Sequence, residues 1–344
     1  MAGRKAGAQL KDVALAAGVS ATTVSRYLNH KLALPETTAS RIETAIGRLD
    51  YQPNPHARRL SLGRSETIGL IIPDIANPFF AQLADAVQQV AEQEGLEMLL
   101  CATRNRPERE LSDLMRLRRD HVDGLLFVTN HADDGSLAAA LGAGDRVVLM
   151  DEDVAGTIGP KVFADNAMGG TLAAQHLIAA GHRRLAIVGG PPGLLSTAER
   201  HAGFHAAVAA AGPPHTVVFE DFGGYGVQPG RDAAMRMLDM DAPPTAVFAT
   251  CDEIALGVME AARARGITVP AMLSIIAFDD IGPLHLLDPP LSAIRQPVTA
   301  MGRCGVTLLV AALRGEDTPR VPTRLPVELV ERASVVPPHR TTEP

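Results

Sequence analysis

The sequence predicts an α/β protein in which a small all-α head precedes two doubly wound parallel sheets. Apolar residues in the first fifty positions follow helical spacing, with no run typical of a strand. From Thr67 onward, short apolar runs alternate with amphipathic stretches, which indicates parallel strands covered by helices on both faces. The alternation runs twice, from 67 to about 164 and again from about 165, so we expect two lobes that meet at a cleft.

Length and composition favour a multidomain globular protein. The 344 residues exceed one ordinary hydrophobic core, and 46% apolar with 21% charged residues argues against wholesale disorder. The basic N-terminus has no apolar segment behind it, and no apolar run approaches the ~20 residues that span a bilayer, so we predict neither a secretory signal nor a membrane segment. The cysteines at 101, 251 and 304 are odd in number and widely spaced, which favours a reducing cytoplasm.

The charge is unevenly distributed along the chain. Residues 1–65 hold ten Lys and Arg against four Asp and Glu, a net charge of +6. The whole chain carries −7, which leaves −13 for the remainder. A basic head on an acidic body indicates that the head alone meets a polyanion.

The head predicts three helices. The first begins near Leu10 and ends at Gly18, Ser20 is a good N-cap for a second over 21–28, and a third runs from about 35 to 49. Two short helices across a glycine-containing turn, braced by a third, form a helix-turn-helix unit, whose second helix enters the DNA major groove. Each residue alone would be ordinary helix surface, but the whole pattern favours DNA binding. The candidate contacts are Ser20, Ala21, Thr22, Thr23, Ser25, Arg26 and Asn29.

A fourth helix is predicted after the head. Asn54 is a suitable N-cap, Pro55 suits the first helical position, and Gly63 ends the stretch. A helix of two turns is marginal in water, so the alternative is a linker that never folds.

The segments LKDVALAAGVSATTVSRYLN and LDYQPNPHARRL resemble the head and hinge of the lactose-repressor/galactose-repressor family. The resemblance implies that the hinge helix folds only when two chains dock on operator double-stranded DNA, and that Leu60 wedges into the minor groove at the central base step. It implies a homodimer, since one head reads one half-site of a palindrome. It adds these hinge residues to the DNA-binding set: Asn54, His56, Ala57, Arg58 and Leu60.

The resemblance covers nearly the whole chain and implies a second part folded like a periplasmic sugar-binding protein. Its crossovers between lobes would lie near 150–166, 290–297 and 321–327. The strands expected from apolar runs are 68–72, 98–101, 124–128, 147–150, 185–188, 246–249 and 274–278. Helices are expected at about 78–94, 107–119, 167–180, 198–211, 230–239 and 253–265.

A small ligand is expected outside the carboxyl ends of these strands. Polar and aromatic residues directly after strands are the candidate contacts, and we expect one of Phe79 and Phe80 to line the pocket. The resemblance implies that Arg200 clamps the ligand, that Asp279 binds its hydroxyls and that Gln296 lies nearby, whereas Cys251 replaces the family's frequent Asn. The complete candidate set is Asp74, Asn77, Phe79, Phe80, Asp151, Arg200, Cys251, Asp279 and Gln296.

The middle of the sequence is most similar to the ribose-repressor branch of the family, so a neutral sugar is the expected effector, with a purine-like base or a sugar acid as alternatives. Inducer and co-repressor, and repressor and activator, stay open. The tail lacks heptads, so we expect a dimer without a tetramerising coiled coil.

We therefore predict a cytoplasmic, nucleoid-associated transcription regulator, with repression as its expected role, that has four segments. They are a head at 1–53, a hinge and linker at 54–65, a sensor and dimerisation domain at 66–336 and a flexible tail at 337–344. Within the sensor, one lobe takes about 66–164 and 297–323, and the other about 165–293 and 326–336.

Two other classes of protein fit the sequence less well. An enzyme is disfavoured because no G-x-G-x-x-G, Walker loop or HExxH motif is present, and we predict no catalytic residue, cofactor or metal. His201 and His205 have a spacing that can bind metal but no third ligand nearby in the sequence, so a solvated pair is expected. A secreted sugar-binding protein would share the two lobes, but not the basic head.

Overall fold

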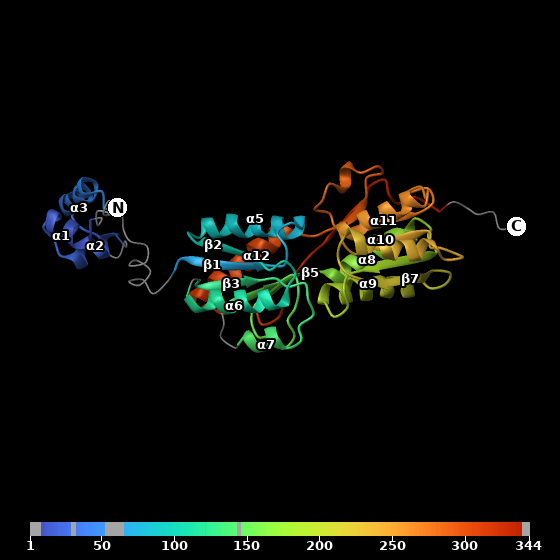
Figure 1. The fold of residues 1–344 in the computed structure, drawn as a ribbon, viewed down its shortest axis with the longest axis horizontal. Coiled ribbons are helices and arrows are strands. Elements are labelled where there is room, and N and C mark those ends of the chain that lie inside the picture. The colour runs from blue at the N-terminus through green and yellow to red at the C-terminus, as the bar shows by residue number, and fades with distance from the viewer. Residues whose placement is uncertain (1–7, 29–31, 52–64, 121, 143–145, 339–344) are drawn as a thin grey trace, which may run out of the picture. The chain divides into compact units, whose positions relative to one another are not determined.

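The computed structural model describes residues 8–28, 32–51, 65–120, 122–142 and 146–338 (Figure 1). Contacts divide the chain into two units, Met1–Glu66 and Thr67–Pro344. Each unit has hydrophobic clusters of its own. In the described part of the chain, no helix is long and apolar enough to cross a membrane.

The first unit contains the three predicted helices, α1 (Leu10–Ala17), α2 (Ala21–Leu28) and α3 (Glu36–Leu49). Gly18 ends α1 in the left-handed conformation at φ 65°, where a side chain would be strained. The Ser20 hydroxyl accepts the Thr23 N–H at 3.0 Å, which confirms Ser20 as the cap of α2.

The three helices share a small core and a cross-link. Val13, Val24 and Ile42, one from each helix, are fully buried. Arg41 of α3 donates from Nε to the carbonyl of Ala17 at 2.9 Å, and from its guanidinium to that of Gly18 at 3.2 Å. These bonds fix the turn between α1 and α2, and therefore the direction in which α2 leaves it.

The second unit contains two sheets, each forming the centre of a lobe. The first-lobe sheet has the order β11-β5-β4-β3-β1-β2, and all its neighbouring strands are parallel. The second-lobe sheet has the order β12-β10-β9-β8-β6-β7, and only β12 runs antiparallel to its neighbour among the described pairs.

The strand bounds are as follows. The first sheet contains β1 (Thr67–Ile72), β2 (Glu97–Ala102), β3 (Gly124–Phe127), β4 (Val147–Met150), β5 (Lys161–Ala164) and β11 (Thr323–Leu325). The second contains β6 (Arg184–Gly189), β7 (Thr216–Phe222), β8 (Ala246–Ala249), β9 (Ser274–Asp279), β10 (Ser292–Arg295) and β12 (Glu328–Val330).

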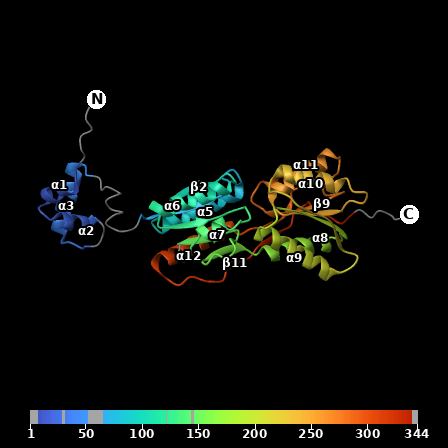
Figure 2. The ribbon, with the colours of Figure 1, turned by 60° about the horizontal axis from the view of Figure 1, so that its bottom comes forward.

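Helices cover both faces of each sheet, as the alternating pattern predicted (Figures 1 and 2). In the first lobe, α5 (Pro78–Gln93) and α12 (Val298–Arg314) cover one face, and α6 (Pro107–Asp120) and α7 (Ser136–Ala140) the other. In the second lobe, α8 (Asn166–Ala179) and α9 (Leu195–Ala211) cover one face. The opposite face is covered by α10 (Val227–Leu238), α11 (Asp252–Ala264) and a 3₁₀ turn, η1 (Leu284–Leu286).

The apolar pattern predicted seven of these strands and missed five. Three of the missed strands, β5, β10 and β11, lie in the segments expected as crossovers, and the chain passes between lobes directly after each. The fourth, β7, is a sheet edge whose residues are exposed or half-buried, so it has no continuous apolar run. The fifth, β12, is three residues long. The long helix α12 was also missed, as was the short α7.

Candidate functional site

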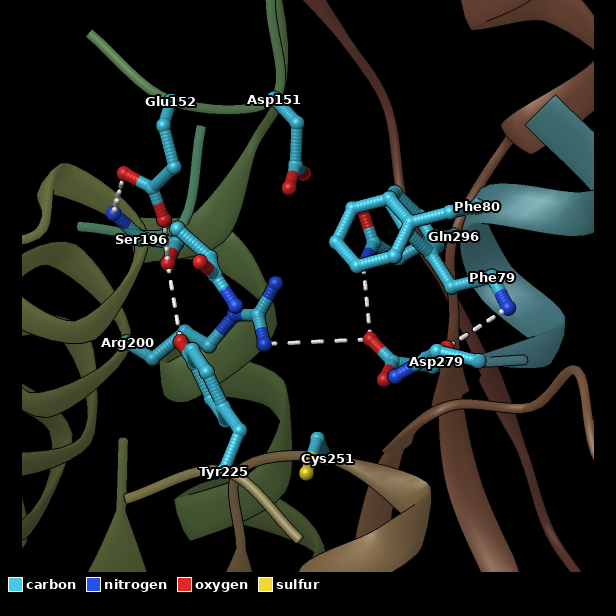
Figure 3. A pocket seen from close by; sticks show the side chains of 12 residues that line it. Phe79, Phe80, Asp151, Glu152, Ser196, Arg200, Tyr225, Cys251, Asp279 and Gln296 are labelled. Carbon is cyan, nitrogen blue, oxygen red and sulfur yellow. Dashed lines mark hydrogen bonds and ion pairs between the residues drawn. The ribbon is translucent and has the colours of Figure 1, made fainter. Parts of the chain in front are cut away.

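A cavity lies between the two lobes, at the carboxyl ends of strands from both sheets (Figure 3). Its empty volume is about 460 Å³ when the space open to solvent is counted. Its lining residues are Asn77, Phe79, Phe80, Asn130, Asp151, Glu152, Ser196, Arg200, Tyr225, Cys251, Asp279 and Gln296.

The start of α5 supplies one wall. Asn77 caps this helix by accepting the Phe79 N–H at 2.9 Å, and its amide donates to Glu253 of the second lobe at 3.2 Å. The rings of Phe79 and Phe80 meet edge to face with centroids 5.2 Å apart. Both rings are buried in the first-lobe core and both line the cavity, so both candidates lie there and not just the one that we expected.

Arg200 on α9 supplies the only positive charge among the described lining residues. Its Nε donates to Asn166 Oδ1 at 2.9 Å and its Nη1 donates to the Thr250 carbonyl at 2.6 Å. Its guanidinium carbon lies 3.7 Å from the ring centroid of Phe278. Because the side chain is only 3% exposed and held on several sides, its position does not depend on a ligand.

Asp279 ends β9 opposite Arg200. Its Oδ1 accepts from the Gln296 amide at 2.7 Å and lies 3.8 Å from Arg200 Nη1. Its backbone has φ 98°, a left-handed value that aims the carboxylate into the cavity at some cost in strain. Burial raises the pKa of Asp279 above that of an ordinary aspartate, while Arg200 opposes that rise.

Asp151 and Glu152 directly follow β4. Glu152 accepts the Ser196 N–H at 3.1 Å and also the Ser196 hydroxyl, whereas Asp151 Oδ1 is buried and has no hydrogen-bond partner among the described residues. Burial raises the pKa of both carboxyls, and the charge of Glu152 raises that of Asp151 further.

Tyr225 closes the second-lobe side. Its hydroxyl lies 3.0 Å from the Ser196 hydroxyl and 3.2 Å from the Thr197 hydroxyl. The ring packs against Gly190, where a Cβ would come within 2.3 Å of it. Burial raises the pKa of Tyr225, so the phenol keeps its proton and can donate a hydrogen bond.

Cys251 combines two roles. Its Sγ accepts the Ile254 N–H at 3.4 Å, which caps α11, and its side chain also lines the cavity. Next to it, the Asp252 carboxylate accepts from the N–H groups of Ile281 and Gly282, both at 2.9 Å, and so holds the loop after β9 beside the cavity.

The structure brings eight of the nine candidate ligand contacts together in this cavity. The exception is Asp74, which is not a lining residue and instead accepts the Ala76 N–H at 2.9 Å in the turn after β1. Sequence reasoning missed Asn130, Glu152, Ser196 and Tyr225. The first two follow the predicted strands 124–128 and 147–150, and that position could have identified them.

The DNA-binding candidates of the head lie on or beside α2. Ala21, Thr22 and Arg26 lie on the solvent side of the helix, Ser20 and Thr23 form the cap, and Val24 points into the core. Ser25 is half-buried on the same helix. The remaining candidates lie outside the described residues; they are Asn29, Asn54, His56, Ala57, Arg58 and Leu60.

The expectation that His201 and His205 form a solvated pair is corrected by the structure. His201 is 4% exposed and stacks on Phe222, with ring centroids 4.2 Å apart. Its Nδ1 lies 2.8 Å and His205 Nε2 lies 2.9 Å from Glu220 Oε1, on the edge strand β7 that the pattern missed. These separations are those of hydrogen bonds, so the carboxylate links both imidazoles.

Two family models match the chain. "Bacterial regulatory proteins, lacI family" matches residues 9–54, and "Periplasmic binding protein-like domain" matches residues 174–335. Among curated relatives, the HTH-type transcriptional regulator DegA of Bacillus subtilis (strain 168) is 34% identical, over 95% of this chain and 97% of its own. The HTH-type transcriptional repressor PurR of Actinobacillus pleuropneumoniae serotype 5b (strain L20) is 33% identical, over 95% and 98%. The ribose operon repressor of Bacillus subtilis (strain 168) is 33% identical, over 94% and 98%.

Solved structures resemble the whole chain as well. The Lac repressor dimer bound to operator and the anti-inducer ONPF aligns with a TM-score of 0.86 and 28% identity, over 96% of this chain and 100% of that one. A complex of the transcriptional regulator CelR with cellobiose aligns with a TM-score of 0.73 and 30% identity, over 95% and 99%.

Proposed function

Because the chain belongs to the lacI family of bacterial regulatory proteins, we propose that it represses transcription as a homodimer on a palindromic operator and that a small ligand between its lobes controls this binding. The observation that carries the proposal is the cavity itself. Side chains that follow strands of two separate sheets converge on it, and the guanidinium in its lining is held in place by other protein groups.

Binding to DNA is assigned to α2 and the hinge. The start of α2 presents Ala21, Thr22 and Arg26, which suits the reading of base edges by the second helix of a helix-turn-helix. The net charge of +6 on residues 1–65 suits phosphate contacts, which are made without regard to sequence. One head reads one half-site, so two chains related by a twofold axis match a palindrome.

The ligand is proposed to be a monosaccharide. A hydroxyl-rich ring has donors for carboxylates such as Asp279, acceptors for the guanidinium of Arg200, and an apolar face for Phe80. Neighbouring carboxylate and guanidinium groups of this kind bind vicinal hydroxyls by charge-assisted hydrogen bonds.

Control of DNA binding follows from the position of the ligand between lobes. The Asn77 amide of the first lobe donates to Glu253 of the second at 3.2 Å, so the two lobes already contact each other beside the cavity. A ligand that contacts both lobes changes the stability of this closed arrangement of the lobes. A ligand shifts affinity for DNA only to the extent that it binds one arrangement better than another. We propose that the hinge at 54–65 transmits this difference to the heads.

The proposal is tested with an operator selected by the full-length protein from a random DNA pool. We expect a palindromic site, binding that is at least ~10³-fold tighter than to random DNA at the same salt concentration, and a change in operator affinity on adding the monosaccharide that raises the unfolding temperature. Asp279→Asn should abolish the sugar response and leave operator affinity in place. A selected pool without a consensus site would contradict DNA recognition, and ligand-independent operator binding would contradict the control mechanism.

A further inference from the structure

The carboxylates around the cavity outnumber its cation. Asp151, Glu152 and Asp279 line it together with one guanidinium, that of Arg200. All four side chains are largely buried, so an unbalanced negative charge there is costly. A second, mostly apolar cavity adjoins the first at Asp279, and its lining includes two further carboxylates, those of Asp252 and Glu253.

The unsatisfied groups of the lining have one chemical character. Three buried oxygen atoms have no hydrogen-bond partner within the described chain, namely Asp151 Oδ1, Asn130 Oδ1 and Gln296 Oε1. All three accept hydrogen bonds, Asp151 Oδ1 when its carboxyl group is ionised. The amides that carry two of them donate elsewhere, from Asn130 to Asn105 at 2.8 Å and from Gln296 to Asp279 at 2.7 Å, so their oxygens are fixed as acceptors. A fitting ligand therefore presents hydrogen-bond donors.

Asp151 differs from the other two lining carboxylates. Asp279 accepts a hydrogen bond from the Gln296 amide and pairs with Arg200. Glu152 accepts hydrogen bonds from the backbone N–H and the hydroxyl of Ser196. Asp151 is 9% exposed, its Oδ1 is unpartnered among the described residues, and its carboxylate points into the open part of the cavity (Figure 3).

On the basis of the proposed function, we propose that the controlling ligand carries a protonated amine beside its hydroxyl groups, as a hexosamine does, and that Asp151 is the counter-ion of this amine. An ammonium supplies both the missing donor and the missing positive charge, whereas a hydroxyl supplies the donor alone. A sugar acid would add a further negative charge to the cavity. An inorganic divalent cation is disfavoured because the Arg200 guanidinium, 3.8 Å from Asp279, occupies the space between the carboxylates.

The inference also predicts a release of protons. The groups that act on the charge of Asp151 are Glu152 and Asp279, which raise its pKa, and Arg200, which lowers it; burial is the largest cause of the rise. An ammonium placed against the carboxylate would lower that pKa again. Near neutral pH, binding of the amine should therefore expel protons from the cavity, whereas a neutral sugar should not.

The test is isothermal titration calorimetry on the full chain with D-glucosamine, D-galactosamine and D-mannosamine, each compared with its parent hexose and uronic acid. We expect at least one hexosamine to bind ~10-fold or more tightly than its hexose, with a heat that varies with the ionisation enthalpy of the buffer. Asp151→Asn should remove this preference and keep hexose binding. Asp74→Asn, the same change at a nearby carboxylate outside the lining, should keep the preference.

The outcomes separate this inference from the proposed function. If a hexose or uronic acid binds as tightly as the corresponding hexosamine and also changes operator affinity, the proposal of an amine is wrong. The proposed control of DNA binding by a ligand is then unaffected. If Ca²⁺ binds to the wild-type protein and not to the Asp151→Asn variant, Asp151 serves an inorganic cation and the amine proposal is wrong. If no hexosamine binds, the inference is wrong, and operator binding measured on the same sample shows separately whether the repressor proposal survives. Thermal unfolding of both variants checks that they fold.

Discussion

The guanidinium of Arg200 lies over the ring of Phe278, with its central carbon 3.7 Å from the ring centroid. Two hydrogen bonds hold it there, from Nε to Asn166 and from Nη1 to the Thr250 carbonyl. Stacking on one face and bonding along two edges use the planar shape of the guanidinium, which an ammonium lacks. Arg200 is therefore fixed by the protein itself, and a ligand does not need to order it.

Arg200→Lys should weaken ligand binding although it keeps the charge. Lysine cannot stack on Phe278 while donating to both Asn166 and Thr250, so we expect ligand affinity to fall roughly 10- to 100-fold, with about 2 kcal/mol less stability. Calorimetry and denaturant unfolding measure the two effects. Arg263→Lys, the same change on the exposed side of α11, is the matched control, and equal behaviour of the two variants would contradict the role assigned to Arg200.

Substitutions at Asp279 should separate charge from backbone strain. The residue has φ 98°, a value that Asn tolerates better than Ala does. Asp279→Asn should therefore fold normally and lose ligand affinity by about 10-fold or more, since the negative charge facing Arg200 is gone. Asp279→Ala should lose the same affinity and also about 1 kcal/mol of stability. Equal unfolding midpoints for the two variants would show that the strain does not matter.

The sequence was most informative where burial is complete. Strands such as β4 and β8 are buried along their whole length, so their apolar runs are continuous and easily recognised. The edge strand β7 mixes exposed and half-buried residues, and β11 and β12 are three residues each, so no run marks them. Their pairing depends on partners distant in the sequence, which local pattern does not contain.

The cavity was predictable only in part for the same reason. A polar residue directly after a buried strand, such as Asp151, or at its end, such as Asp279, is placed by the strand itself. Tyr225 follows the missed strand β7, and its contact with Ser196 joins two segments that only the folded lobe brings together. Asp74 shows the converse error, since it follows a strand but accepts a hydrogen bond within its own turn.

Gly203→Ala should force α8 and α9 apart. A Cβ at Gly203 would lie 1.9 Å from the Ala167 carbonyl oxygen, and one at Gly170 would lie 2.0 Å from that of Arg200, so the helices touch through their backbones. We expect a loss of at least about 2 kcal/mol and weaker ligand binding, because α9 carries Arg200. Gly224→Ala, whose Cβ would lie 3.6 Å from its nearest neighbour, should change stability little. Similar unfolding midpoints for the two variants would contradict this close packing.

Glu110 should make the stability of the first lobe depend on pH. Its side chain is fully buried; Oε2 accepts from the Thr129 hydroxyl at 2.9 Å, and Oε1 has no partner among the described residues. Burial raises the pKa of Glu110 from its ordinary 4.5 to about 7. Because the folded-state pKa is the higher one, the contribution to stability is complete below about pH 4.5 and is lost as pH rises through about 7.

Glu110→Gln tests this, because the amide keeps the shape and an acceptor for Thr129 but does not titrate. The free energy of unfolding should decline less in the variant than in the wild type between about pH 5 and about pH 8. The difference between the two declines should reach about 3 kcal/mol at the alkaline end. Denaturant unfolding at several pH values measures it. Glu108→Gln, an exposed change on the same helix, should keep the wild-type dependence of stability on pH. If the stability of the Glu110→Gln variant falls with pH as steeply as that of the wild type, buried Glu110 is not the cause of the pH dependence.

Leu60→Ala should weaken recognition of the operator much more than binding to random DNA. An apolar wedge in the minor groove opens a base step and bends the duplex, which brings additional contacts only at a sequence that bends easily. Random DNA is bound through phosphates, by the positive charges of the head, and a leucine has no part in that attraction. Fluorescence anisotropy should therefore show operator affinity about 10-fold or more weaker, with the affinity for random DNA and its salt dependence unchanged.

Leu15→Ala, a change at another leucine of the head (85% exposed on α1), is the control and should affect neither. Equal losses on both kinds of DNA would place Leu60 among the general determinants of affinity and remove the wedge from the mechanism.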